Sequence, residues 1–214
     1  MEELKPAILL GAGGHARVVY ELARLIGYEV IGMCAPELPD ESDNFWNGMK
    51  YFGPDNSLDF LDSSDYFLLN GIGQMPFNST RRFVYDKFTA RGFYFPALIH
   101  PFSFVSPSAT VLDGAQVFAG AILQANVKVG SNVIINTRVS VDHDSVISDN
   151  VHLAPGSIVC GGVCIEAGVF VGAGAVVANG VHVGLNSVIG AGASCVKDMP
   201  QASKLVPLNK RALL

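Results

Sequence analysis

The 214-residue chain carries little charge of either sign. Only 15% of its residues are Asp, Glu, Lys or Arg, and the formal net charge at pH 7 is -5. A chain without a positive excess has no electrostatic field that would hold a polyanion, which argues against nucleic acid as a partner. Half of the residues are hydrophobic, so we expect a folded chain rather than a disordered one.

Long apolar runs, an export signal and paired cysteines are also missing. No uncharged apolar stretch reaches the roughly 18 residues that a membrane-spanning helix needs, so we expect no such helix. The opening segment MEELKP has neither the basic nor the apolar region of a secretory signal. The four cysteines form no C-x-x-C pair and have no accompanying histidine cluster. We therefore expect reduced thiols, no metal site and a cytoplasmic location.

The second half of the chain is a six-residue repeat. From Val105 to Ser194 it divides into 15 hexads without an insertion. Every first position is Val, Ile or Leu, every fifth is Ala, Val or Ser, and 12 of the 15 fourth positions are Gly or Asn. The aliphatic and small residues suit a narrow interior, and Gly and Asn tolerate the left-handed backbone of a tight corner. The repeat predicts a parallel β-solenoid with three hexads in each coil.

Residues 6–95 have no such period and predict a different domain. Buried strands are expected at 7–11, 28–34 and 65–70, and helices at 15–27 and 78–92. Strands that alternate with helices are typical of a small parallel sheet with Rossmann-like crossovers.

Finer features of this domain also follow from the sequence. The buried side of the first helix is expected to contain Val18, Val19, Leu22 and Leu25. Asn78 or Ser79 is expected to cap the second helix. The polar and acidic segment 37–48 predicts an exposed loop.

The segment GAGGHA at 11–16 matches G-x-G-x-x-[GA] between the first strand and the first helix. Free backbone N–H groups and the helix dipole favour a phosphate at such a place. A dinucleotide fold would add an acidic residue about 20 positions on for the ribose, but the sequence there is Met33-Cys34-Ala35. The motif thus favours a nucleoside diphosphate over NAD, and a tight turn without a ligand remains the alternative.

Both halves together resemble one family, the hexapeptide-repeat sugar O- and N-acetyltransferases of the sialic-acid O-acetyltransferase type. The resemblance rests on GAGGHA at 11–16, on NTRVSVDHD at 136–144 and on His152, and it is strongest to the UDP-4-amino-sugar N-acetyltransferases of the bacillosamine pathway. It implies a left-handed β-helix, a homotrimer with active sites between subunits, and acetyl-CoA as co-substrate. The expected domains are a Rossmann-like nucleotide-sugar domain at 1–95, a β-helix acetyltransferase domain at 96–200 and a tail at 201–214.

His143 and Asp144 are the candidate catalytic pair. They occupy positions three and four of the hexad VDHDSV, at a corner, where an imidazole projects outward instead of into the apolar interior. Their match to the family implies that His143 is the general base and that Asp144 raises its basicity. Asp144 also fills the column that requires a left-handed backbone, so a purely conformational role is an alternative for that residue.

The resemblance implies further contacts. Gly13, Gly14 and His15 match the substrate-binding loop, and Asn136 matches a polar residue near the substrate. Further cofactor contacts are expected at His152 and, by adding 18 to the corner at Pro155, at Ala173 and Ala191. The family often has acidic residues after the second strand where this chain has Cys34-Ala35.

The sequence thus predicts an acetyl-CoA-dependent N-acetyltransferase that acts on the 4-amino group of a UDP-4-amino-4,6-dideoxy-N-acetyl-hexosamine during surface-glycan synthesis. Transfer would be direct, without an acyl-enzyme. O-acetylation of a sialic acid or a related sugar is the alternative within the family. A solenoid scaffold or metabolite-binding protein without catalysis is the alternative outside it.

Overall fold

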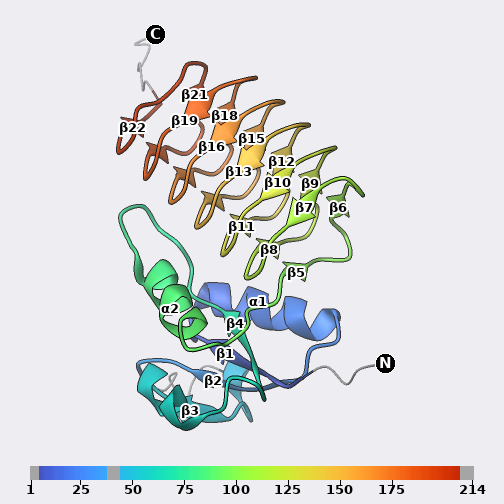
Figure 1. Ribbon diagram of the computed structural model, residues 1–214, viewed down its shortest axis with the longest axis vertical. Coiled ribbons are helices and arrows are strands. Elements are labelled where there is room, and N and C mark those ends of the chain that lie inside the picture. The colour runs from blue at the N-terminus through green and yellow to red at the C-terminus, as the bar shows by residue number, and fades with distance from the viewer. Residues whose placement is uncertain (1–4, 38–43, 208–214) are drawn as a thin grey trace. The chain divides into compact units, whose positions relative to one another are not determined.

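The computed structural model describes residues 5–37 and 44–207. The chain forms two compact units, Met1–His100 and Pro101–Leu214, each with its own core (Figure 1). In the described residues no helix is long and apolar enough to cross a membrane. All four cysteines are free thiols, with Cys34 and Cys195 buried.

The first unit is built on a four-stranded parallel sheet with the order β3-β2-β1-β4. Its strands are β1 (Ala7–Leu10), β2 (Val30–Cys34), β3 (Tyr51–Gly53) and β4 (Phe67–Asn70). Its helices are α1 (Gly14–Leu25), α2 (Thr80–Thr89) and the short 3₁₀ turns η1 (Asn44–Trp46) and η2 (Asp55–Phe60). The short strand β5 (Leu98–Ile99) ends the unit. The expected Rossmann-like sheet is confirmed, and β3 is an additional strand.

Helix α1 buries only part of the expected side. Its buried residues are Ala16, Val19, Leu22 and Ala23. Val18 and Leu25, which the sequence places on the buried side, are 45% and 57% exposed. Helix and sheet approach closely because the buried stripe contains alanine: a Cβ on Gly71 would lie 2.8 Å from that of Ala16. The expectation is therefore confirmed for Val19 and Leu22 and wrong for Val18 and Leu25.

Two other details refine the sequence expectation. Ser79 occupies the N-cap of α2 but makes no side-chain cap bond. Instead, Asn78 Oδ1 accepts a hydrogen bond from the Thr80 amide at 2.8 Å. Within the segment expected to be an exposed loop, residues 38–43 lie outside the described part, but Trp46 is 5% exposed. The indole packs inward because its ring meets Tyr20 and Phe45.

The second unit is a left-handed parallel β-helix with three faces. Face 1 includes β8 (Gln116–Val117), β11 (Ile134–Ile135), β14 (His152–Leu153), β17 (Phe170–Val171), β20 (Val188–Ile189) and β22 (Lys204–Leu205). Face 2 consists of β6 (Phe104–Val105), β9 (Ile122–Leu123), β12 (Ser140–Val141), β15 (Ile158–Val159), β18 (Val176–Val177) and β21 (Ser194–Cys195). Face 3 consists of β7 (Thr110–Val111), β10 (Lys128–Val129), β13 (Val146–Ile147), β16 (Cys164–Ile165) and β19 (His182–Val183).

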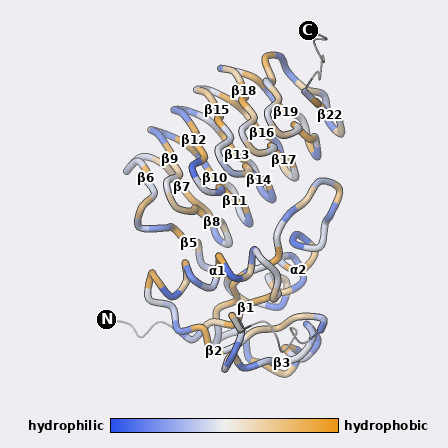
Figure 2. Tube along the Cα trace, turned by 180° about the vertical axis from the view of Figure 1, so that it is seen from behind, coloured by the Kyte–Doolittle hydropathy of each residue, from blue (hydrophilic) through white to orange (hydrophobic). Residues whose placement is uncertain are grey.

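Successive coils stack in a register of 18 residues. On face 1, Ile134 pairs with His152 and Ile135 with Leu153; the same step repeats along the other faces. Figure 2 shows hydrophobic residues recurring along the coils. Three hexads per coil is therefore confirmed. The last strand, β22, falls within the segment 201–214 that the sequence sets apart as a tail.

Each position of the hexad has the structural role that its residue type favours. First and fifth positions fill the interior with a continuous column of buried aliphatic and small side chains. From Gly114 to Gly192, every fourth position has a positive φ, including Arg138 (58°) and Asp144 (59°). The tight corners therefore form even where the residue is neither Gly nor Asn.

Candidate active site

In the first unit, the glycine loop joins β1 to α1. Gly11 has a φ of 96°, and α1 begins at Gly14 after an N-cap at Gly13. A Cβ built on Gly13 or Gly14 would meet no atom within 4 Å, so the space above the helix N-terminus is open. Trp46 Nε1 donates a hydrogen bond to the Ala12 carbonyl at 3.1 Å and anchors the loop. The geometry suits a phosphate group.

A second glycine loop follows β4 and lies against the first. Gly71 donates its amide hydrogen to the Leu10 carbonyl at 2.8 Å, and a Cβ on Gly73 would lie 3.4 Å from that of His15. Buried Arg81 fixes this loop: its Nη1 donates to the carbonyls of Asn70 at 3.0 Å and Ile72 at 2.8 Å. Burial lowers the pKa of the Arg81 guanidinium to about 9. Sequence reasoning missed Arg81 and Trp46, although a single tryptophan in a polar segment was a usable signal.

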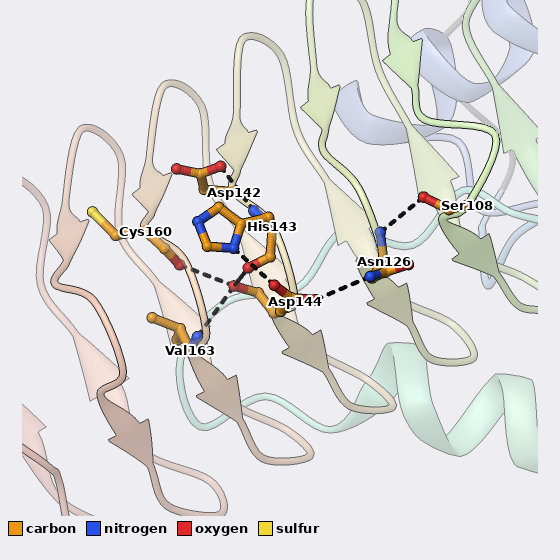
Figure 3. Close-up of polar contacts among 8 residues, drawn as sticks. Ser108, Asn126, Asp142, His143, Asp144, Cys160 and Val163 are labelled. Carbon is orange, nitrogen blue, oxygen red and sulfur yellow. Dashed lines mark hydrogen bonds and ion pairs between the residues drawn. The ribbon is translucent and has the colours of Figure 1, made fainter.

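In the second unit, His143 and Asp144 form the corner between β12 and β13, where face 2 meets face 3 (edge 2/3). Both side chains are 59% exposed, and His143 Nδ1 lies 2.9 Å from Asp144 Oδ2 (Figure 3). The Asp142 carboxylate accepts a hydrogen bond from the His143 amide at 2.8 Å. Asp144 has a positive φ and also contacts the imidazole, so its geometry is compatible with both roles that the sequence suggests.

Charges around this corner favour a protonated imidazole. The hydrogen bond with Asp144, followed by the negative charge of Asp142, raises the pKa of His143 above its ordinary value. Hydrogen bonds from His143 and then Asn126 lower the pKa of the Asp144 carboxyl. With Nδ1–H donating to the carboxylate, the neutral imidazole presents Nε2 as the proton acceptor.

The ring of His143 lies over Gly161 in the next coil. A Cβ built on Gly161 would lie 2.7 Å from Nε2 and 2.8 Å from Cε1 of His143. Gly161 is the only glycine at the third position of any hexad. The other hexads therefore carry a side chain at the third position. At 161, the imidazole of His143 occupies the space that a side chain would need.

Asn136 and His152 meet near the corner between face 1 and face 2 (edge 1/2). Asn136 Oδ1 accepts from the Thr137 amide at 2.8 Å, so its Nδ2 is the atom that faces His152 Nε2 at 3.2 Å. The His152 side chain is almost buried, at 8% exposure, and packs edge-on against Phe170 with centroids 5.1 Å apart.

Ala173 and Ala191 stack on this same edge. The amide of Gly174 donates to the Pro155 carbonyl at 3.0 Å, and that of Gly192 donates to the Ala173 carbonyl at 2.9 Å. The column Pro155, Ala173 and Ala191 therefore advances one coil at each step. Because the side chains of this column are small, a long ligand has room to lie along the edge.

Comparison with known proteins identifies the family. Residues 7–88 match the family model described as the PglD N-terminal domain. Perosamine N-acetyltransferase from Caulobacter crescentus, solved with CoA and GDP-perosamine, is 30% identical with a TM-score of 0.84, covering 97% of this chain and 96% of that chain. The chain belongs to the hexapeptide-repeat sugar acetyltransferases.

Two other solved structures are similar to this chain. The acetyltransferase domain of PglB from Neisseria gonorrhoeae, solved with acetyl coenzyme A, is 32% identical with a TM-score of 0.83, covering 94% of this chain and 95% of that chain. WeeI from Acinetobacter baumannii, at 20% identity, shares the fold, with a TM-score of 0.81 and coverage of 95% and 97%. No curated protein sequence matches significantly.

In this acetyltransferase, the predicted base and the predicted cofactor contacts lie on different edges of the β-helix. His143 and Asp144 occupy edge 2/3, whereas Asn136, His152, Ala173 and Ala191 lie on or beside edge 1/2. Face 2 separates the two groups within one chain. Among the residues 5–37 and 44–207, no three His, Cys, Asp or Glu side chains are grouped as metal ligands.

Proposed function

We propose that the protein transfers the acetyl group of acetyl-CoA to the 4-amino group of a UDP-4-amino-4,6-dideoxy-N-acetyl-hexosamine. The observation that carries the proposal is the exposed pair of His143 and Asp144, with Nε2 of the imidazole directed away from the carboxylate. Membership of an acetyltransferase family removes the alternative of a scaffold without catalysis.

The chemistry requires a base at this position. A sugar amine attacks only when it is neutral, and its attack on a thioester releases a proton. His143 Nε2 accepts that proton, and Asp144 stabilises the imidazolium that forms. Acetyl-CoA supplies an acyl group already activated as a thioester, so transfer needs no nucleophilic side chain of the protein.

Each of the two proposed substrates, the nucleotide sugar and acetyl-CoA, has candidate binding residues on the chain. Gly13, Gly14 and His15 at the open N-terminus of α1 suit the diphosphate of the nucleotide sugar. The low edge at Ala173 and Ala191 suits the pantetheine arm, with His152 near the thioester. Asn136, held beside His152, is placed to orient the reacting groups.

The separation of the two edges supports a trimer. A base on edge 2/3 reaches a thioester on edge 1/2 only if the two edges belong to neighbouring copies. Face 2, which lies between these edges, presents exposed apolar side chains that suit burial against another copy: Phe104, Ile122 and Ile158. We therefore propose a homotrimer whose active sites lie between subunits.

The proposed nucleotide has two candidates, UDP and GDP, which differ only in the base. The resemblance to bacillosamine-pathway enzymes supports UDP, whereas the relative solved with GDP-perosamine makes a GDP-linked amino sugar the second candidate. Both candidates share the diphosphate and the amino sugar that the glycine loop and His143 require.

A substrate panel tests the proposal. Purified protein is supplied with acetyl-CoA and UDP-4-amino sugars of both C4 configurations, GDP-perosamine or free sialic acid, and release of the CoA thiol is followed. We expect turnover with a UDP-4-amino sugar and a product heavier by one acetyl group. Turnover with sialic acid alone would instead establish O-acetylation and overturn the proposal.

A further inference from the structure

A ladder of polar side chains runs along edge 2/3 and ends at His143. Ser108, Asn126 and Asp144 occupy the fourth position of hexads that are 18 residues apart, so they stack in successive coils. Ser108 Oγ accepts from the Asn126 amide at 3.1 Å, and Asn126 Nδ2 donates to Asp144 Oδ1 at 3.1 Å (Figure 3). Asp144 Oδ2 then contacts His143 Nδ1 at 2.9 Å.

The two oxygens of the Asp144 carboxylate are thus held by different partners. One oxygen accepts from Asn126 in the preceding coil, and the other contacts the imidazole. A carboxylate that is 59% exposed and held at one oxygen only is free to rotate away from its partner. The second contact, from a rigid coil, restricts that rotation.

We propose that Asn126 is a positioning residue that holds the Asp144 carboxylate against His143 in the acetyl-transfer reaction. The inference rests on the proposed role of His143 as the base. The backbone supports it: Asn126 (φ 60°) and Asp144 (φ 59°) share the left-handed conformation, so their side chains leave successive corners in the same direction. The Asp144 amide also donates to the Ala125 carbonyl at 2.9 Å, which locks the two corners together.

Other charged or titratable groups near the imidazole do not replace this contact. Asp142 is engaged with the backbone amide of His143. Lys128 of the preceding coil lines the same surface hollow as Asn126 and Asp144. Cys160 of the following coil lies beside the corner (Figure 3). Among the hydrogen bonds that hold the Asp144 carboxylate, Asn126 is the donor from another coil.

The variant Asn126→Gly isolates the amide. Glycine accepts a positive φ without strain, so the corner is retained while the donor to Asp144 is lost. We expect kcat to fall about three- to tenfold, the effect of losing one modest hydrogen bond, with the KM values of both substrates unchanged. Asn186→Gly is the matched control, because Asn186 is another fourth-position asparagine with a φ of 55°, on a different edge. This control should leave kcat unchanged.

Two measurements separate positioning from a structural effect. In an Asp144→Gly background, Asn126→Gly should have no further effect on kcat, because its target is absent. In NMR titrations of the imidazole signals, assigned with a His143→Gln variant, the raised pKa of His143 should move towards its ordinary value in Asn126→Gly. The titration needs no substrate, so it decides the inference even if no sugar in the panel is acetylated.

The opposite results would overturn the inference. If Asn126→Gly leaves the His143 titration unchanged, Asn126 does not position the pair. If its full effect on kcat persists without Asp144, it acts by another route. Failure of acetyl transfer by the wild-type protein would refute the proposed function alone.

Discussion

Replacing Gly161 by alanine should displace the His143 imidazole while leaving the coil beneath it intact. The added Cβ would lie 2.7 Å from Nε2 and 2.8 Å from Cε1 of His143. Ordinary contacts between such atoms are about 3.5 Å, so the ring must move by roughly 0.8 Å. A misplacement of about 1 Å is sufficient to slow a reaction as much as 100-fold. We therefore expect Gly161→Ala to lower kcat roughly 10- to 100-fold.

The assay is a pair of steady-state and thermal measurements. kcat and both KM values come from release of the CoA thiol, and circular dichroism gives the melting temperature. Ala167→Val is the control, since it adds volume at the same hexad position on the edge between faces 3 and 1. Both variants should fold, and only Gly161→Ala should lose kcat. A Gly161→Ala protein that folds normally and retains at least half of the wild-type kcat would refute the steric argument.

Three other predictions concern the base and the nucleotide loop. His143→Ala should lower kcat by roughly 10²–10⁴-fold, with partial recovery at higher pH as more of the sugar amine becomes neutral; near-normal kcat would contradict the mechanism. Because the pKa of His143 is raised, wild-type kcat should increase with pH through an inflection above the ordinary histidine value, and Asp144→Gly should move that inflection lower on the pH axis. Trp46→Phe removes the hydrogen bond to Ala12, worth about 1 kcal/mol, and should raise KM for the nucleotide sugar but not for acetyl-CoA, as kinetics in each substrate will determine.

The β-helix was predictable from sequence because the interactions that form it are local and repeat every six residues. Each hexad carries its own inward residues and its own corner, so 15 copies of a weak signal define the coil and its register. Even Arg138 and Asp144, which break the Gly and Asn pattern, adopt the corner conformation. The neighbouring coils impose this conformation on the two residues.

The first unit was less predictable because its details depend on contacts between distant segments. The burial of Trp46 follows from its contact with the glycine loop 34 residues earlier. The close approach of α1 to the sheet depends on small residues, including Ala16, that carry little hydrophobic signal.

In the candidate site, the pairing of His143 with Asp144 followed from adjacent residues at a corner. The contributions of Asn126 and Gly161 did not, because they arise from stacking between coils. The sequence shows Asn126 only as an ordinary corner asparagine, and it shows Gly161 as an unusual third-position glycine without showing which side chain needs the space. Their contacts with the catalytic pair appear once residues 18 apart are placed one above the other.

The central claim is that the base of one copy acts on acetyl-CoA bound by the next, and subunit complementation tests it most directly. His143→Ala removes the base, and Ala173→Trp blocks the proposed cofactor edge, so each variant alone should be nearly inactive. Co-expressed with different tags, the two chains form mixed trimers in which one of the three interfaces combines an intact base with an intact cofactor edge. We predict that purified mixed trimers recover about a third of the wild-type activity. Mixed trimers as inactive as either parent would place the whole site within one chain and contradict the account.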